Sequence, residues 1–177
     1  MVSLDKLFDP QSIAVVGASD QPGKIGNTLV VNVTHGRKRR LYPVNPNEKE
    51  VLGLKCYPSV RSIPEVVDLA ILAVPAKVSV QITKECAEIG VPYVVLIAAG
   101  FGEIGEEGRT LEEQIRNAIR GTKTRAIGPN TMGVMAPRAE LDAIFTPRDR
   151  SPRPKDGVIS VISQSGSVLC GVYEGAE

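Results

Sequence analysis

The stretch Ser12-Ile13-Ala14-Val15-Val16-Gly17-Ala18-Ser19 decides the fold. Its residues 13–16 are apolar at successive positions, not at every second one, and the run ends at a glycine. Such a run indicates a strand that is covered on both faces, as in a parallel sheet. A helix that opens near Gly26 and has apolar residues between positions 29 and 33 is expected to follow it.

The same alternation of strand and helix continues along the chain. Further strands are predicted at residues 40–44, 68–74, 93–97, 125–127 and 158–162. One helix is expected to place Val78, Ile82, Cys86 and Ile89 on one stripe and to end at Gly90. A second has Leu111, Ile115, Ala118 and Ile119 on its apolar face. This pattern predicts an α/β fold with a doubly wound, mostly parallel sheet and right-handed crossovers.

The chain divides near its C-terminal end. Residues 148–157 are charged, contain two prolines and have no aliphatic side chain, which is typical of a linker. We therefore predict one domain over residues 1–147, a linker over 148–157, and over 158–177 the beginning of a second, incomplete α/β domain. One strand and one helix cannot bury their own apolar faces, so this tail either docks on the first domain or is completed elsewhere.

Composition excludes several classes of protein. The 177 residues include 42% hydrophobic and 23% charged residues, which argues against a disordered chain. The 21 Lys and Arg residues are nearly balanced by 20 Asp and Glu residues, so no basic surface for nucleic acid is expected. There is no Trp, so an aromatic platform for base stacking is not expected either. No apolar run is long enough to cross a membrane, and three scattered cysteines suit a reducing compartment. We expect a cytoplasmic protein.

The turn after the first predicted strand is rich in glycine. Gly17, Gly23 and Gly26 follow the spacing G-x5-G-x2-G, which is neither the dinucleotide-binding fingerprint nor a Walker A loop. Either the glycines allow a ligand to approach the backbone closely, or they are needed only for the conformation of the turn. The second strand ends at Asn45-Pro46, with no carboxylate before Glu48 to bind a ribose hydroxyl, and this disfavours NAD.

The remaining strand ends contain small residues, glycine and proline, and no nucleophile with its base. His35, the only histidine, falls at the far end of the first helix, and Glu103 is a single acid without a partner for acid–base chemistry. The basic run at residues 37–40 is more typical of a solvated face than of a phosphate site. The chain is thus expected to bind a ligand and not to perform chemistry unaided.

Five segments together resemble one family. They are residues 12–19, 42–46, 73–76, 100–103 and 128–133. In this order they are similar to the CoA-binding domain of NDP-forming acyl-CoA synthetases. The likeness is greatest to acetate–CoA ligase (ADP-forming), and the succinyl-CoA synthetase alpha subunit is a more distant relative. The resemblance covers residues 1 to about 147 and implies a Rossmann-like domain with coenzyme A as its ligand.

The resemblance also implies which residues contact CoA. The nucleotide and its phosphates would lie on Gly17, Ala18, Ser19, Gly23, Lys24 and Gly26. Asn45 and Pro46 would flank the adenosine end. Val74 and Pro75 would follow the diphosphate and pantetheine, and Ala99, Gly100 and Asn130 would lead the thiol onward. The relative's phosphate-binding lysine has no clear counterpart, since Asn47 or Glu48 occupies its place; Lys49 and Lys24 are the two candidates.

The tail resembles the start of the family's ligase domain, where Ser163, Ser165 and Gly166 would hold a phosphohistidine. The alternative is a serine N-cap beside a glycine turn. The phosphohistidine itself and the ATP-grasp residues would lie outside this chain, and His35 is not that histidine.

The leading hypothesis is therefore a CoA-binding part of an ADP-forming acyl-CoA synthetase, with a ligase domain and an ATP-grasp (beta) subunit as partners in an oligomer. The alternatives are a stand-alone CoA-binding protein, an NAD-binding regulatory domain and a CoA-binding module fused to a protein acyltransferase.

Overall fold

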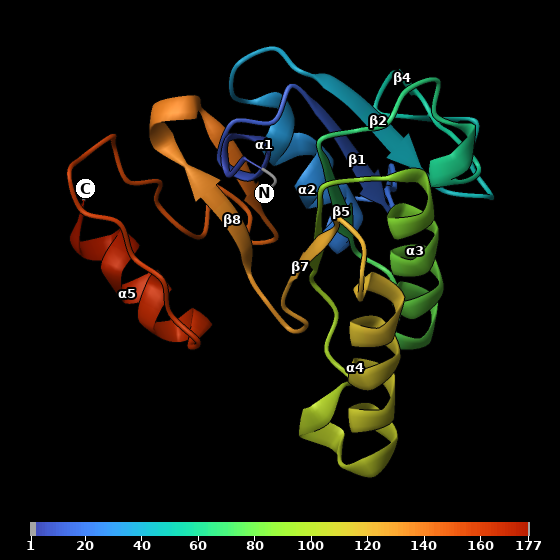
Figure 1. Ribbon diagram of the computed structural model, residues 1–177. Helices are drawn as coiled ribbons and strands as arrows, with labels where there is room; N and C mark the ends of the chain where they lie inside the picture. Colours follow the sequence, from blue (N-terminus) through green and yellow to red (C-terminus); the bar gives the residue numbers. More distant parts are fainter. Residues whose placement is uncertain (1–2, 177) are drawn as a thin grey trace.

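A computed structural model describes residues 3–176 (Figure 1). Its centre is a five-stranded sheet in which every neighbouring pair is parallel, in the order β2-β1-β5-β6-β7. The strands are β1 (Ser12–Val16), β2 (Arg40–Val44), β5 (Leu69–Leu72), β6 (Tyr93–Leu96) and β7 (Arg125–Ile127). The Rossmann-like α/β class and the first five predicted strands are confirmed.

The sheet is covered on both faces, which explains its uninterrupted apolar runs. Along β1, Ile13 and Val15 pack into one core with α2 (Ile25–Thr34). Ala14 and Val16 pack into a second core with α3 (Ala76–Ile89) and α4 (Glu106–Ile119). Every one of these four strand residues is at most 4% exposed. Consecutive side chains of a strand point to opposite faces, so each must be apolar here.

On the α2 side a hairpin takes the place of a second helix. Strands β8 (Gly133–Ala136) and β9 (Leu141–Ile144) pair antiparallel, and Val134, Leu141 and Ala143 join the core that α2 covers. The apolar pattern of residues 133–144 does not predict this hairpin. The short elements are α1 (Asp5–Phe8), the β3 (Glu50–Val51) and β4 (Leu54–Lys55) hairpin, and the 3-10 turns η1 (Val60–Ser62), η2 (Gly102–Ile104) and η3 (Pro137–Ala139).

The buried face of α3 is not centred on the predicted stripe. Val78 is 45% exposed, whereas Ser79 and Thr83 are completely buried. Their hydroxyls donate inside the fold, from Ser79 Oγ to the Val74 carbonyl at 3.0 Å and from Thr83 Oγ1 to the Ser79 carbonyl at 2.7 Å. Small residues whose hydroxyls are hydrogen-bonded to nearby carbonyls can therefore face the sheet. The stripe predicted from the apolar residues lies one position too early along the helix. The helix ends at Gly90 (φ +86°), as expected.

The strand predicted at residues 158–162 does not form. Val158, Ile159 and Ile162 are 100%, 85% and 98% exposed. A strand needs a neighbour for its backbone groups, and within the described residues none pairs with this segment. The helix predicted after it is present as α5 (Gly166–Gly175), which lies beside the β8–β9 hairpin and away from α3 and α4 (Figure 1).

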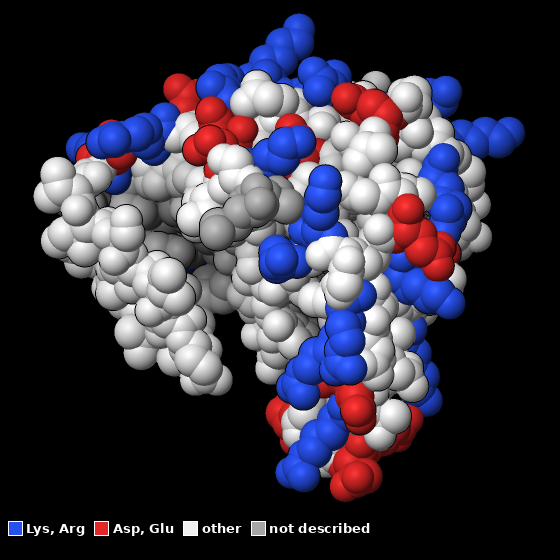
Figure 2. Space-filling view, viewed as in Figure 1, with Lys and Arg blue, Asp and Glu red and all other residues white. Residues whose placement is uncertain are grey.

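Charges of both signs are interspersed over most of the face shown in Figure 2, whereas the part formed by α5 has few. None of the helices in residues 3–176 combines the length and the apolar character needed to span a bilayer.

Candidate functional site

The order of the strands locates the candidate site. From β1 the chain moves to β2 on one side, and later continues through β5, β6 and β7 on the other. In open α/β sheets a crevice forms outside the carboxyl ends of the two strands at this switch point. Here those ends are Gly17 after β1 and Ala73-Val74 after β5.

Two glycines close the turn backbone against backbone. Gly17 has φ +85°, and a Cβ there would lie 2.4 Å from the Ala73 carbonyl oxygen. A Cβ on Gly26 would lie 1.8 Å from the Gly17 carbonyl oxygen. Gly23 has φ +86° but nothing within 4 Å of its Cβ position, so it lies at the open tip of the turn. The glycines at both ends are required for packing, and the middle one leaves space for a ligand.

Polar side chains support the turn from within. Asn45, just after β2, donates from Nδ2 to the Ala18 carbonyl at 2.8 Å. Asn27 of α2 donates from Nδ2 to the Ser19 carbonyl at 3.0 Å, and the Ser19 hydroxyl accepts the Gln21 amide. Ser19 and Asn45, which we predicted as ligand contacts, thus hold the shape of the turn. Their roles toward a ligand stay predictions.

An anion would meet favourable groups at this turn. The first amides of α2 lack intrahelical acceptors and form the positive end of the helix dipole. Lys24 is exposed at the N-cap position of α2, and it takes part in none of the ion pairs within residues 3–176. Pro46 is exposed beyond Asn45, and no carboxylate follows β2 directly. This chemistry suits phosphates better than a ribose diol.

The strand ends form one continuous edge. Pro75 caps α3 directly after Val74, and a Cβ on Gly100 would lie 3.4 Å from Ala76 Cβ. The Asn130 amide donates to the Ala98 carbonyl at 3.0 Å, and Asn130 has φ +54°. The predicted residues that follow β1, β5, β6 and β7 therefore lie next to one another along the carboxyl edge of the sheet.

Two carboxylates accept the backbone amides of the loop after β6. Glu103 accepts the Gly100 amide at 2.5 Å and the Phe101 amide at 3.2 Å, and Glu112 accepts the Gly102 amide at 2.8 Å. The Gly100 amide is the main reason that the pKa of Glu103 lies below its usual value. The conformation of the loop after β6 is thus fixed by hydrogen bonds from its amides to Glu103 and Glu112.

Farther along the edge, a cavity of about 820 Å³ joins the two predicted parts of the site. Asn130 and Thr131 line it on the sheet side, and Ser163 and Gly166 line it at the start of α5. A Cβ on Gly166 would lie 2.9 Å from the Met132 sulfur, so glycine lets α5 approach the sheet closely. Cys170 and Thr146 also line the cavity, and neither was predicted.

The serines of this segment have local roles. Ser165 is the N-cap of α5, where its Oγ accepts the Val168 amide at 3.4 Å. The Ser163 Oγ accepts the Ser165 amide at 3.1 Å. The remaining first amides of α5 have no intrahelical acceptors, a property of every helix start. Ser163 and Gly166 thus face the cavity, whereas Ser165 acts as a cap.

His35 lies elsewhere. It is exposed at the C-terminal end of α2 and lines a separate cavity of about 270 Å³ with Glu140 and Arg148.

Comparison with known proteins agrees with this geometry. The family model "CoA binding domain" matches residues 11–137. The chain is 44% identical over 172 residues to the acetate–CoA ligase [ADP-forming] I subunit alpha of Pyrococcus furiosus, covering 94% of this chain and 36% of that one. The chain thus spans little more than a third of this relative's length.

Two solved structures share the fold. A protein from Pyrococcus horikoshii OT3 superposes with a TM-score of 0.89 at 40% identity, covering 98% of this chain and 39% of that one. The apo form of dinucleotide forming acetyl-coenzyme A synthetase 1 from Ca. Korarchaeum cryptofilum gives 0.85 at 37% identity, covering 98% and 37%. With its glycine turn at the switch point and these matches, the chain belongs to the CoA-binding domain family of acyl-CoA synthetases.

Proposed function

We propose that this chain holds CoA along the carboxyl edge of its sheet and serves as the CoA-binding part of an ADP-forming acyl-CoA synthetase. One observation supports this most: a single edge runs from the Gly17–Gly26 turn to the 820 Å³ cavity. CoA is a long ligand with phosphates at one end and a thiol at the other, and such an edge suits both ends.

The phosphate end lies at the glycine turn in this proposal. The α2 amides supply hydrogen-bond donors, Lys24 supplies a positive charge, and Gly23 leaves the approach open. Ala18 and Ser19 contribute backbone, while Asn45 and Pro46 flank the adenosine. These residues bind and orient the nucleotide and take part in no proton transfer.

The pantetheine arm continues past Val74 and Pro75 toward Ala99, Gly100 and Asn130. Its thiol then reaches the cavity, where the α5 N-terminus with Ser163 and Gly166 provides a second site for an anion. A phosphorylated histidine supplied from outside residues 1–177 suits that site. The chain would thereby place the thiol near an acyl phosphate that its partners make.

The proposed reaction is acyl-CoA + ADP + phosphate giving acid + CoA + ATP, run in the cytoplasm by an oligomer that includes a ligase domain and an ATP-grasp subunit. The P. furiosus relative is an alpha subunit and is much longer than this chain, which supports further domains and subunits. The exposed apolar side chains of Val158, Ile159 and Ile162 support a continuation of the fold around residues 158–177.

Hydrogen exchange with and without CoA tests the placement. We expect slower exchange in two separate segments, residues 17–27 and residues 128–133 together with the start of α5. Protection of the first segment alone would limit the site to the nucleotide and remove the cavity from it. Protection around His35 and Arg148, at the other end of α2, would contradict the proposed edge.

A further inference from the structure

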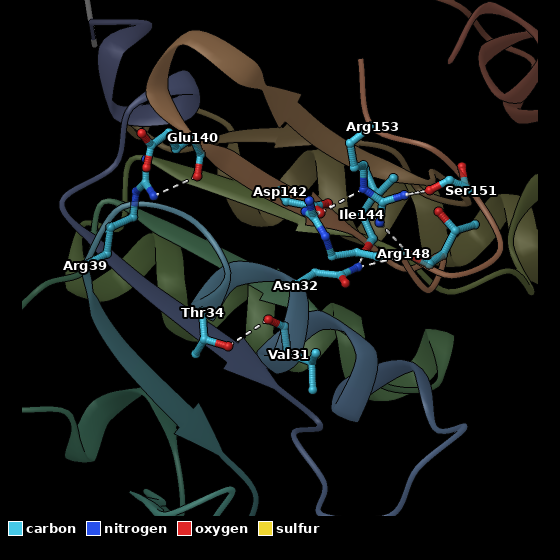
Figure 3. A network of polar contacts seen from close by, with 11 residues as sticks. Val31, Asn32, Thr34, Arg39, Glu140, Asp142, Ile144, Arg148, Ser151 and Arg153 are labelled. Atoms are coloured by element: carbon cyan, nitrogen blue, oxygen red, sulfur yellow. Dashed lines mark hydrogen bonds and ion pairs between the residues drawn. The ribbon is translucent and has the colours of Figure 1, made fainter. Parts of the chain in front are cut away.

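A buried carboxylate in β9 holds two arginines. Asp142 is 6% exposed, and its Oδ2 accepts Arg148 Nη1 at 2.5 Å and Arg153 Nε at 2.8 Å (Figure 3). The side chain of Arg153 is 10% exposed, whereas that of Arg148 is 41% exposed. Arg153 is therefore the partner that is fixed within the protein. The segment predicted as a linker is held against the hairpin by these contacts.

Arg153 uses its remaining donors on backbone carbonyls. Nη1 donates to the Ser151 carbonyl at 2.6 Å and Nη2 to the Thr146 carbonyl at 2.7 Å. The Thr146 carbonyl also accepts Nδ2 of Asn32 at 3.0 Å. Asn32 lies in α2, is 1% exposed and donates to the Ile144 carbonyl as well, at 2.8 Å (Figure 3). The Thr146 carbonyl thus joins α2 to the segment that leads to α5.

The same network reaches one wall of the large cavity. Tyr173 is half-buried, and burial raises the pKa of its hydroxyl while the nearby Arg153 charge lowers it. Thr146 and Phe145 line the large cavity, on which α5 forms another wall. The Arg153 guanidinium therefore binds the Thr146 backbone at this wall, while Arg153 itself lines the separate cavity beside His35 and not the large one.

The glycine turn is independent of this network. The start of α2 is fixed by the contact of Gly26 with Gly17, and Leu29 and Val30 are completely buried in the core. Loss of Arg153 would therefore change the cavity and leave the turn in place. Asp142 would keep only the more exposed Arg148 as its partner, and the Thr146 carbonyl would lose the Arg153 donor, so the effect should be confined to this wall.

We propose that Arg153, held by Asp142, is a positioning residue that fixes the cavity wall at Thr146 and thereby sets the preference for a ligand with a pantetheine arm over the bare nucleotide. The inference rests on the proposed function, because it assigns the arm to this cavity.

Calorimetry with two ligands tests it. CoA is compared with adenosine 3′,5′-bisphosphate, which has the nucleotide end without the arm. In Arg153→Ala we expect the ratio of the two affinities to fall about tenfold, equivalent to about 1.4 kcal/mol, with bisphosphate binding unchanged. Arg150→Ala is the matched control: Arg150 is exposed, and within residues 3–176 its side chain forms no hydrogen bond or ion pair. This control should bind both ligands as the wild type does.

Arg153→Lys keeps the inference testable should the alanine variant unfold. Lysine keeps the charge beside Asp142 but cannot also reach two carbonyls with a planar fork, so the ratio should fall to an intermediate value. An unchanged ratio in both variants, or an equal loss for both ligands, would overturn the positioning role. Failure of the wild type to bind CoA is a different result and would overturn the proposed function from which this inference starts.

Discussion

The Gly26 α-carbon faces the Gly17 carbonyl so closely that a Cβ on Gly26 would lie 1.8 Å from that oxygen. Helix α2 therefore meets the end of β1 backbone to backbone. The carbonyl of Gly17 is in this way covered by the helix, whose first amides have no intrahelical acceptors. The contact explains how this loop, longer than the usual dinucleotide-binding turn, still brings a helix N-terminus to the switch point.

Replacing Gly26 by alanine should destabilise the turn. The added methyl must push backbone apart, and overpacking of this kind costs about 1–3 kcal/mol. Chemical denaturation measures the loss, and CoA affinity should fall with it. Gly23→Ala is the matched control, since φ +86° strains an alanine there but nothing lies within 4 Å. A loss of about 1 kcal/mol is expected for Gly23, whereas the backbone clash at Gly26 puts its loss at the upper end of the range, about 3 kcal/mol. Equal or reversed losses would contradict the packing role of Gly26.

Lys24 should be the lysine that binds the CoA phosphates. It lies at the N-cap of α2, where its charge adds to the helix dipole, whereas Lys49 follows the second strand in an exposed turn. Lys24→Ala is expected to weaken CoA binding about five- to tenfold, because a charge-assisted bond contributes about 1.5–3 kcal/mol before solvent screening. Lys49→Ala should change little. The reverse ranking in calorimetry would transfer the phosphate site to Lys49.

The loop after β6 should loosen in acid. Glu103 holds the Gly100 and Phe101 amides, and these bonds lower the pKa of Glu103 below its usual value. A carboxyl whose folded-state pKa is depressed adds stability above its unfolded pKa and loses it as the pH falls through the folded one. The Gly100 amide resonance should therefore titrate with a midpoint below about 4.3. A midpoint at or above that value would show that Glu103 does not hold the loop.

The cysteines should differ in reactivity. Burial raises the pKa of Cys86 to about 12. Cys56 is also buried, and burial raises the pKa of its thiol as well. Cys170 is partly exposed and lines the large cavity. Iodoacetamide at about pH 8.5, near the ordinary cysteine pKa, should alkylate Cys170 and leave Cys86 intact until the protein is denatured. Rapid modification of Cys86 in the folded protein, measured by mass spectrometry, would contradict the position of α3.

Elements with a simple residue pattern are predicted well from the sequence. Ile13 to Val16 and Leu69 to Leu72 are apolar at every position because both faces of the sheet are covered, so the strands, their class and the switch point follow directly. The glycine turn and Asn130 could be placed at strand ends for the same reason. Position along the chain is sufficient to locate them.

What the sequence could not predict depends on distant partners. Asp142 is a charge in the middle of a buried strand, and only Arg148 and Arg153 from the following segment make that burial tolerable. Ser79 and Thr83 face the sheet because each hydroxyl finds a carbonyl in its own helix or turn. Residues 158–162 have the apolar pattern of a strand, yet pairing decides whether one forms, and within the described residues none pairs with them.

The most direct test of the account is a calorimetric titration of this chain with CoA, with CoA that lacks its 3′-phosphate, and with NADH. We predict that CoA binds, that removal of the 3′-phosphate weakens binding, and that NADH does not bind, because no carboxylate follows β2 directly. Binding of NADH without binding of CoA would contradict it and assign the crevice to a dinucleotide.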